Sequence, residues 1–105
     1  MHKNLEIAFL IPCFNEEATI SNVVRQCHKT VPEAKIYVYD NNCSDKTAVL
    51  AKQAGAIVRH EKSQGKGNVV RRMFADIDAD IYILCDGDMT YDIASTPKMM
   101  HQLIT

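Results

Sequence analysis

Residues 7–27, IAFLIPCFNEEATISNVVRQC, change from one hydrophobic period to another within a few positions. The first part, Ile7–Ile11, is a continuous apolar run closed by Pro12, which is typical of a strand buried on both faces of a parallel sheet. From Glu16 onward the apolar side chains recur every three or four residues, which predicts an amphipathic helix. We expect Asn15 as the N-cap of this helix and the two glutamates after it in the first turn. The stretch therefore predicts a strand followed directly by a helix.

Strand and helix patterns alternate along the rest of the chain. Further strands are predicted at residues 35–40, 56–60 and 80–85, and the strand at 56–60 is less apolar, which places it near a sheet edge. Alternating strands and helices with short connections predict a parallel sheet with helices on both faces. Ligands bind outside the carboxyl ends of the strands in such sheets. We therefore expect an α/β fold with its binding site along one edge.

Two more helices are predicted between these strands. The first ends at Gly55, with Asn42 or Ser44 as its cap. The second buries one face, formed by four apolar side chains: Val70, Met73, Phe74 and Ile77. Another helix is expected to begin at Thr96 and Pro97.

Composition and charge exclude several classes of protein. The 105 residues include 12 basic and 13 acidic side chains, so the chain has neither the basic field that binds nucleic acid nor a polybasic patch for anionic lipid. Its N-terminal apolar run is too short for a signal-peptide core or a membrane span, which predicts a cytoplasmic location. The four cysteines form no Cys-x-x-Cys pair, so we expect reduced, packed thiols and no zinc site.

Two aspartates, Asp86 and Asp88, directly follow the 80–85 strand. They admit three interpretations: the nucleophile and acid of an Asp-x-Asp-x-Thr phosphatase, a pair of carboxylates that hold Mg²⁺ or Mn²⁺ on a diphosphate, or a solvated turn. Their place at the end of a buried strand favours function. Only 17 residues follow Asp88, too few for the other phosphatase motifs, so the metal interpretation is favoured.

Polar residues also follow the other strands. The carboxylate of Asp40 ends the 35–40 strand and could accept from nucleobase N–H groups or a ribose hydroxyl. The residues after it, Asn41 to Asp45, are predicted to cap the next helix rather than to bind. Gly65, Lys66 and Gly67 offer a flexible loop and one cation suited to a phosphate, although the pattern is not a classical phosphate-binding loop.

Four motifs occur in a fixed order along the chain: IPCFNEE, YDNNCSDKT, GKGNVVR and DGDMTYD. With them the sequence resembles the family 2 glycosyltransferases, which are nucleotide-sugar-dependent inverting enzymes of GT-A fold. The resemblance spans about residues 5 to 104 and is closest to the polyprenyl-phosphate sugar transferases. It implies a Rossmann-like α/β fold, a UDP-type or GDP-type sugar donor, a divalent Mg²⁺ or Mn²⁺ ion, and an acceptor such as polyprenyl phosphate or a glycan.

The resemblance implies a role for each matching residue at the nucleoside end of the donor. Three residues match positions that frame the nucleoside: Pro12, Phe14 and Glu16. Asp40 matches the aspartate that recognises the base. Cys43 stands where many relatives have serine, which is expected only to weaken a local cap.

At the diphosphate end, the resemblance places basic side chains and the metal. Lys66 and Arg71 match basic positions near the diphosphate, and Asp86 and Asp88 match the metal ligands, of which Asp86 also contacts the donor. Met73 replaces a common glycine in the third helix. Thr90 stands where the polyprenyl-phosphate branch often has a glutamine near the metal.

Relatives of this kind continue through further strands that supply the general base and the acceptor site. Residues 1–105 are therefore expected to form the nucleotide-sugar-binding, N-terminal part of the domain, stopping after its fourth strand and helix, with the catalytic base elsewhere.

An exposed apolar sheet edge would favour a homo-oligomer. Membrane contact is expected only through a lipid-linked acceptor, at the inner face. The alternative is a module that binds nucleotide without catalysis; a receiver domain and a dinucleotide-binding fold are disfavoured by the residues after the first strand.

Overall fold

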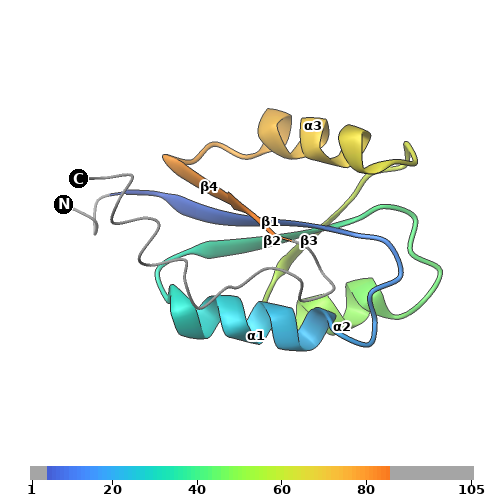
Figure 1. The fold of residues 1–105 in the computed structure, drawn as a ribbon, viewed down its shortest axis with the longest axis horizontal. Helices are drawn as coiled ribbons and strands as arrows, with labels where there is room; N and C mark the ends of the chain where they lie inside the picture. Colours follow the sequence, from blue (N-terminus) through green and yellow to red (C-terminus); the bar gives the residue numbers. More distant parts are fainter. Residues whose placement is uncertain (1–4, 86–105) are drawn as a thin grey trace.

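A computed structural model describes residues 5–85 of the chain (Figure 1). Strands and helices alternate throughout this range: β1 (Ile7–Cys13), α1 (Ile20–Thr30), β2 (Lys35–Asp40), α2 (Thr47–Gln53), β3 (Ile57–His60), α3 (Lys66–Asp76) and β4 (Ile81–Leu84). The predicted alternation is confirmed, although β1 continues through Pro12 to Cys13, two residues beyond the predicted run, and the ends of β3 and β4 are shifted by one residue. The helix expected from Thr96 lies outside the described residues.

The four strands form one parallel sheet in the order β3-β2-β1-β4. Strand β1 lies in the interior of the sheet, with its Cys13 opposite Asp40 of β2 and its Leu10 opposite Leu84 of β4. The chain adds β2 and β3 on one side of β1 and then crosses to the other side for β4. This reversal of strand order lies between β1 and β4, and it is the usual place for a ligand in an open α/β sheet.

Helices cover both faces of the sheet, with α1 and α2 on one side and α3 on the other (Figure 1). Alternate side chains of β1 therefore enter different cores. Ile7, Phe9 and Ile11 pack in the core under α1 and α2, whereas Ala8 and Leu10 pack in the core under α3. All five are at most 2% exposed, which explains why this strand is a continuous apolar run. The predicted fold class is confirmed.

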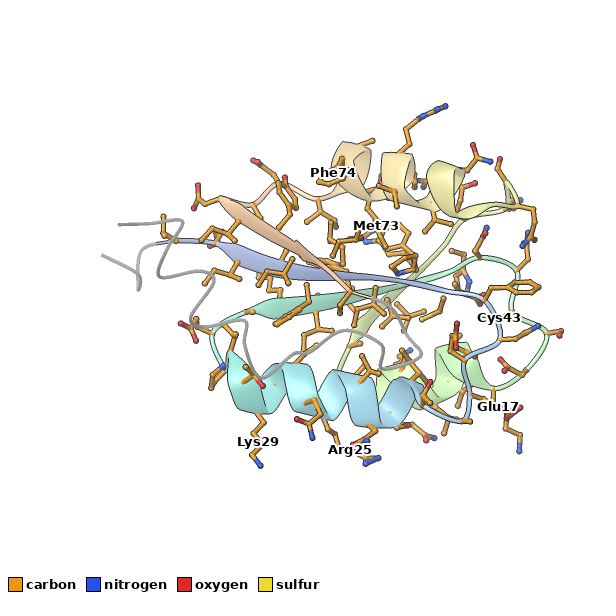
Figure 2. All side chains as sticks on the ribbon, in the orientation of Figure 1. Glu17, Arg25, Lys29, Cys43, Met73 and Phe74 are labelled. Atoms are coloured by element: carbon orange, nitrogen blue, oxygen red, sulfur yellow. The ribbon has the colours of Figure 1, made fainter. Side chains whose placement is uncertain are left out.

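Helix α3 contacts the sheet through one row of side chains spaced four residues apart: Val69, Met73 and Ile77. The prediction that Phe74 is buried is wrong, because this ring is half-exposed and packs edge-on against Tyr82, with ring centroids 5.1 Å apart. Val70 is only partly buried. Met73 is fully buried and fills the space between helix and sheet, as Figure 2 shows. Met73 and Ile77 are therefore buried as predicted, whereas Val69 is buried in place of Val70.

Helix α1 begins at Ile20, later than predicted. Asn15 has a φ of 55° and its side-chain oxygen accepts the N–H of Ser44 at 2.8 Å, so it does not cap the helix. The carbonyl of Glu16 accepts the N–H groups of Thr19 and Ile20 at 3.1 and 2.9 Å, which forms a turn before the helix. The expected cap is wrong because a contact with a distant loop engages the Asn15 side chain.

Helix α2 is not capped by Asn42 or Ser44, contrary to prediction. Lys46 precedes its first residue, and the carboxylate of Asp45 accepts the N–H of Thr47 at 2.9 Å. A carboxylate at this end also interacts favourably with the helix dipole, as expected for Asp45.

The predicted end of α2 at Gly55 is confirmed. Gly55 has a φ of 106°, and its N–H donates to Lys52 O at 3.1 Å, while the N–H of Ala56 donates to Ala51 O at 3.0 Å. This pair of bonds is the Schellman arrangement that ends a helix. A Cβ atom at Gly55 would lie 2.9 Å from Nε2 of His28 on α1, so the residue also permits close packing of the two helices.

None of the helices in residues 5–85 is long and apolar enough to cross a membrane.

Replacing Gly55 by alanine is expected to lower the free energy of unfolding by about 1–3 kcal/mol, because the positive φ and the His28 contact both penalise a Cβ atom. The matched control is Gly67→Ala, where a Cβ meets nothing within 4 Å and φ is not positive. The control should lose no stability. Urea unfolding of both variants tests this, and a loss at Gly55 no larger than at Gly67 would contradict it.

Candidate functional site

The four residues predicted at the nucleoside end lie along the carboxyl edge of β1 and β2. Asp40 ends β2 beside Cys13, and it is buried, at 8% exposure. Pro12 lies in β1 and is partly buried, and Phe14, directly after the strand, is 51% exposed. Glu16 follows in the turn before α1. The sheet thus brings a buried carboxylate and an exposed aromatic ring to the same edge.

The Asp40 carboxylate is held from two sides. Its Oδ1 accepts the N–H of Cys43 at 2.6 Å, and its Oδ2 lies 3.1 Å from Nδ1 of His60 at the end of β3. The His60 side chain is 67% exposed, so its ring borders the carboxylate without covering it. Each carboxylate oxygen can accept two hydrogen bonds, so Asp40 is fixed in orientation and retains acceptor capacity.

The loops after β1 and β2 are joined by hydrogen bonds around Thr47. The hydroxyl of Thr47, which is fully buried, accepts the N–H of Glu16 at 2.8 Å and donates to Asp45. The other oxygen of Asp45 accepts the N–H of Glu17 at 3.2 Å. Desolvation acts to raise the pKa of Asp45, but the bonds from Thr47 and Glu17 outweigh it and hold that pKa below its ordinary value.

Cys43 provides a second link between these loops. Its Sγ accepts the N–H of Asn15 at 3.2 Å and lies 3.5 Å from the carbonyl oxygen of Cys13 (Figure 2). Desolvation, together with the neighbouring Asp40 carboxylate, raises the pKa of Cys43 to about 11. The residue is thus a neutral thiol that joins two loops, rather than a weakened helix cap. All four cysteines are free thiols, as predicted.

Asn41 joins the ends of three strands. Its backbone N–H donates to Cys13 O at 2.9 Å, and its side-chain Nδ2 donates to the carbonyl oxygens of Glu61 and Ser63 at 2.9 and 2.8 Å. Its Oδ1 accepts the N–H of Gly65 at 3.0 Å. The sequence had suggested only helix capping for this segment. No local pattern indicates the role, because the side-chain partners lie 20 to 24 residues away.

The loop of residues 61–65 has two further anchors. Nδ2 of Asn42 donates to Lys62 O at 2.8 Å from an exposed position. The Glu61 carboxylate accepts the N–H of Ser63 at 2.7 Å and lies 3.5 Å from Nη1 of Arg72. The bond from Ser63, assisted by the Arg72 charge, holds the pKa of Glu61 below its ordinary value.

Arg72 also ties this loop to the face of the sheet under α3. Its Nε donates to Oδ2 of Asp76 at 2.8 Å, and the hydroxyl of Tyr39 donates to the same oxygen at 2.8 Å. The bond from Tyr39, with that from Arg72, lowers the pKa of Asp76, while burial and the same bond raise the pKa of Tyr39. A continuous polar chain therefore runs from β2 through α3 to the 61–65 loop.

The two basic residues predicted near a diphosphate lie on α3. Lys66 is the first residue of the helix, directly after Gly65, and its side chain is outside the described part of the structure. Arg71 lies in the second turn and lines a hollow of about 250 Å³ with Glu61, Ser63 and Asn68. Arg71 is therefore near the loop that Asn41 holds, and it forms no hydrogen bond or ion pair with Asp40.

Asp86 and Asp88 lie outside the described residues. Cys85, directly before them, donates its N–H to Leu10 O at 3.1 Å, so the pairing of β4 with β1 extends to that residue. Within residues 5–85, no group of three His, Cys, Asp or Glu side chains is placed to hold a metal ion. The donor set that the sequence offers after β4 is made of carboxylate oxygens, which suit a hard cation such as Mg²⁺ or Mn²⁺.

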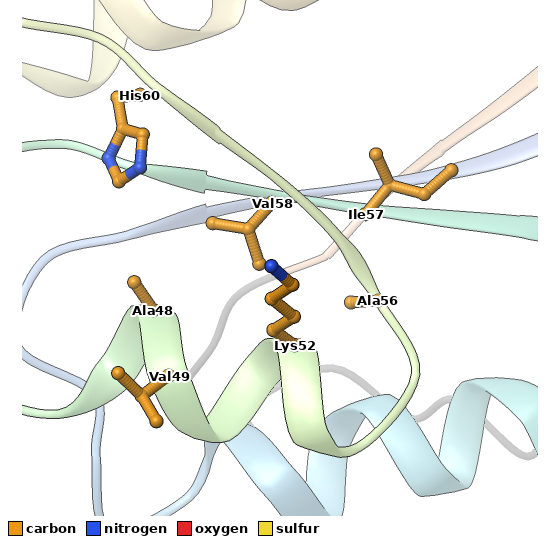
Figure 3. A pocket seen from close by; sticks show the side chains of 7 residues that line it. All are labelled: Ala48, Val49, Lys52, Ala56, Ile57, Val58 and His60. Carbon is orange, nitrogen blue, oxygen red and sulfur yellow. The ribbon is translucent and has the colours of Figure 1, made fainter.

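A groove of about 410 Å³ lies between α2 and β3 (Figure 3). Its lining is mostly aliphatic: Ala48, Val49, Lys52, Ala56, Ile57, Val58 and His60. Among these, only Lys52 and His60 carry titratable groups, so the groove lacks the paired acids or bases of a catalytic centre.

The chain belongs to glycosyl transferase family 2, whose family model matches residues 8–105. Among curated proteins, Protein RfbJ of Shigella flexneri is 51% identical over 104 residues, which cover 99% of this chain and 81% of RfbJ. Glycosyltransferase AglJ of Haloferax volcanii is 35% identical over 98 residues, which cover 92% of this chain and 32% of AglJ. The family assignment by resemblance is therefore confirmed.

Solved structures show the same arrangement of strands and helices. The glucosyl-3-phosphoglycerate synthase of Mycobacterium tuberculosis superposes with a TM-score of 0.86 at 26% identity, over 97% of this chain and 42% of the synthase. That synthase has been solved with Mn²⁺, UDP and glucosyl-3-phosphoglycerate, and with Mg²⁺ and UDP. The fold of the chain is GT-A-like, and the chain spans less than half the length of that relative.

Cys43 is expected to react slowly with iodoacetamide near neutral pH. Because its pKa is raised to about 11, its alkylation rate should still climb about tenfold per pH unit between pH 8 and 10. Mass spectrometry of the intact protein measures the rate, and Cys43→Ser should remove the label, since the other three cysteines are buried. A rate that levels off near pH 9, as for an ordinary thiol of pKa about 8.5, would argue against this environment.

Proposed function

We propose that residues 1–105 form the nucleotide-sugar-binding part of a metal-dependent, inverting glycosyltransferase that uses a UDP-type or GDP-type donor. One observation carries the proposal: a buried, oriented carboxylate, Asp40, and an exposed ring, Phe14, lie together at the carboxyl edge of a family 2 sheet. The strand order reverses beside them, between β1 and β4.

At the nucleoside end, Asp40 accepts an N–H group of the base with the lone pairs that Cys43 and His60 leave available. The neighbouring Phe14 offers an aromatic surface to the nucleoside, and Pro12 and Glu16 complete its frame. A charge-assisted hydrogen bond from a base N–H to a buried carboxylate gives discrimination between bases, because a base without the matching N–H leaves the carboxylate without that donor.

At the diphosphate end, Lys66 and Arg71 supply positive charge, and Asp86 and Asp88 hold Mg²⁺ or Mn²⁺. The N-terminus of α3 adds the positive end of a helix dipole next to Lys66. When bound, the metal stabilises the negative charge that builds on the leaving nucleoside diphosphate. Complexes of the related synthase with UDP and either Mn²⁺ or Mg²⁺ support this assignment.

The acceptor is proposed to be polyprenyl phosphate or a glycan, reached in the cytoplasm or at the inner face of the membrane. Similarity to the dolichol-phosphate mannosyltransferase of Pyrococcus furiosus supports the lipid acceptor, at 20% identity over 94% of this chain and 30% of that protein. The general base for the acceptor hydroxyl is assigned to no residue of this chain.

The test of the donor site is calorimetric titration with UDP and GDP, with and without Mn²⁺. Asp86→Ala and Asp88→Ala should remove the metal-dependent part of the affinity, a loss of about tenfold or more, equal to about 1.4 kcal/mol. Asp40→Ala should weaken nucleotide binding by about 1.5–3 kcal/mol with or without metal, because a hydrogen bond to a charged group is lost. Asp78→Ala, at an exposed position on the loop after α3, is the matched control. It should change neither the nucleotide affinity without metal nor the additional affinity that Mn²⁺ gives.

Each result has a distinct meaning. Absence of UDP and GDP binding by the wild type would overturn the proposed function, and unchanged metal dependence in both Asp86 and Asp88 variants would overturn the metal assignment. A donor-hydrolysis or sugar-transfer assay separates a transferase from a module that only binds nucleotide. Membership of family 2 counts against the phosphatase interpretation of Asp86.

We further propose that the chain self-associates through the β4 side of its sheet. In the described part of the chain, β4 pairs on one side only, Leu84 at its end exposes apolar surface, and so does Phe74 of α3, which packs against Tyr82 of β4. Such edges favour pairing with another chain. Light scattering should give a mass above 11.8 kDa, the mass of one chain, and a monodisperse monomer would count against this proposal.

A further inference from the structure

We propose that Asn41 is a positioning residue that fixes the diphosphate end of the donor site relative to the base end. The inference rests on the proposed function, since it assigns a role within that site. Asn41 does not itself need to contact the nucleotide. It acts through the loop of residues 61–65, which leads into the first turn of α3.

The side chain of Asn41 matches its surroundings in a way that few residues can. It is buried, at 4% exposure, between two carbonyl oxygens that need donors and one N–H that needs an acceptor. A carboxamide supplies both kinds of group, whereas the isosteric carboxylate of aspartate only accepts. An aspartate here would place negative charge against the carbonyl oxygens of Glu61 and Ser63.

The hydrogen bond between Asn41 and Gly65 fixes the start of α3 relative to the end of β2. Gly65 has a φ of 117°, precedes the helix and has no side chain to cap it. Its carbonyl accepts the N–H groups of Asn68 and Val69 at 3.1 and 3.3 Å, so the position of Gly65 sets the first turn of the helix. Because Asn41 binds the N–H of the same glycine, it sets where that turn begins, and Lys66 is its first residue.

The backbone of Asn41 connects this loop to the opposite end of the site. Its N–H donates to Cys13 O, and Cys13 lies opposite Asp40 in the sheet. One residue thus joins the end of β1, the end of β2 and the loop after β3. A nucleotide-sugar donor would reach from Asp40, at the base end of the site, to the start of α3, at the diphosphate end. Because Asn41 fixes the distance between these two ends before the donor binds, binding requires less ordering of the protein and is stronger.

The neighbouring Asn42 provides a matched control. Its side chain also donates to the 61–65 loop, at Lys62 O and at Oε1 of Gln64, but from an exposed position. Water can replace those bonds when Asn42 is changed, so Asn42→Asp alters the same atoms and the same charge without leaving buried groups unpaired.

The experiment compares wild type, Asn41→Asp and Asn42→Asp for two ligands: UDP with Mn²⁺ by calorimetry, and uridine by NMR titration. For Asn41→Asp we expect UDP affinity to fall about tenfold, equal to about 1.4 kcal/mol, with uridine affinity unchanged. Asn42→Asp should stay within about twofold of wild type for both ligands, equal to about 0.4 kcal/mol, because water can replace the hydrogen bonds of this exposed side chain. Asn41→Ser, which keeps one hydroxyl donor and acceptor, should lose less than Asn41→Asp and serves if the aspartate variant does not fold.

The outcomes distinguish failure of the positioning role of Asn41 from failure of the proposed donor-binding function. If wild type binds UDP and the Asn41 variants bind it equally well, the positioning role is wrong and the donor site stands. If UDP and uridine affinity fall by the same factor, the effect is a general loss of structure and the positioning role is again wrong. If wild type binds neither UDP nor GDP, the proposed function fails, and the inference fails with it; if it binds only GDP, GDP and guanosine replace UDP and uridine in the comparison.

Discussion

The pairing of β1 with strands on both sides is the constraint from which the rest of the structure follows. Because β2 and β4 flank it and helices cover both faces of the sheet, β1 is buried at every residue except Pro12, and its side chains divide between the two cores. Parallel pairing then brings the carboxyl ends of all four strands to one edge. The polar residues of the site lie at the ends of these strands, in the loops that follow them, or in the helices after those loops.

The site edge is held together by hydrogen bonds between loops rather than within them. Thr47 and Cys43 join the loops after β1 and β2, and Asn41 joins both to the loop after β3. The bonds made by Thr47 and Asn41 are shielded from water, since both side chains are buried. The arrangement leaves Asp40 oriented and Phe14 exposed, a combination suited to holding a flat polar ring.

The parts of the fold that depend on neighbouring residues could be predicted from the sequence. The apolar run of β1 and the helix end at Gly55 follow from local patterns, and both agree with the structure. The errors concern contacts between distant segments. Asn15 bonds to a loop 29 residues away instead of capping α1, and Phe74 is turned away from the core because Met73 occupies the space under α3.

The same distinction between local and distant contacts decides which residues of the candidate site could be predicted. Asp40 was predictable, because its position at a strand end is visible in the sequence, whereas Asn41 was not, because its three side-chain partners come from after β3. The roles of Asp86 and Asp88 stay predictions that rest on their place after β4.

The hydrogen bonds around Thr47 have a consequence for how a nucleoside would arrive. The loops after β1 and β2 lose their conformational freedom when the chain folds, since each is bonded to the other without any ligand. For these two loops, binding of a nucleoside then requires no further ordering of the backbone. A nucleoside held there would lose its own freedom of motion on association, whereas the two loops would lose little more than they lost on folding.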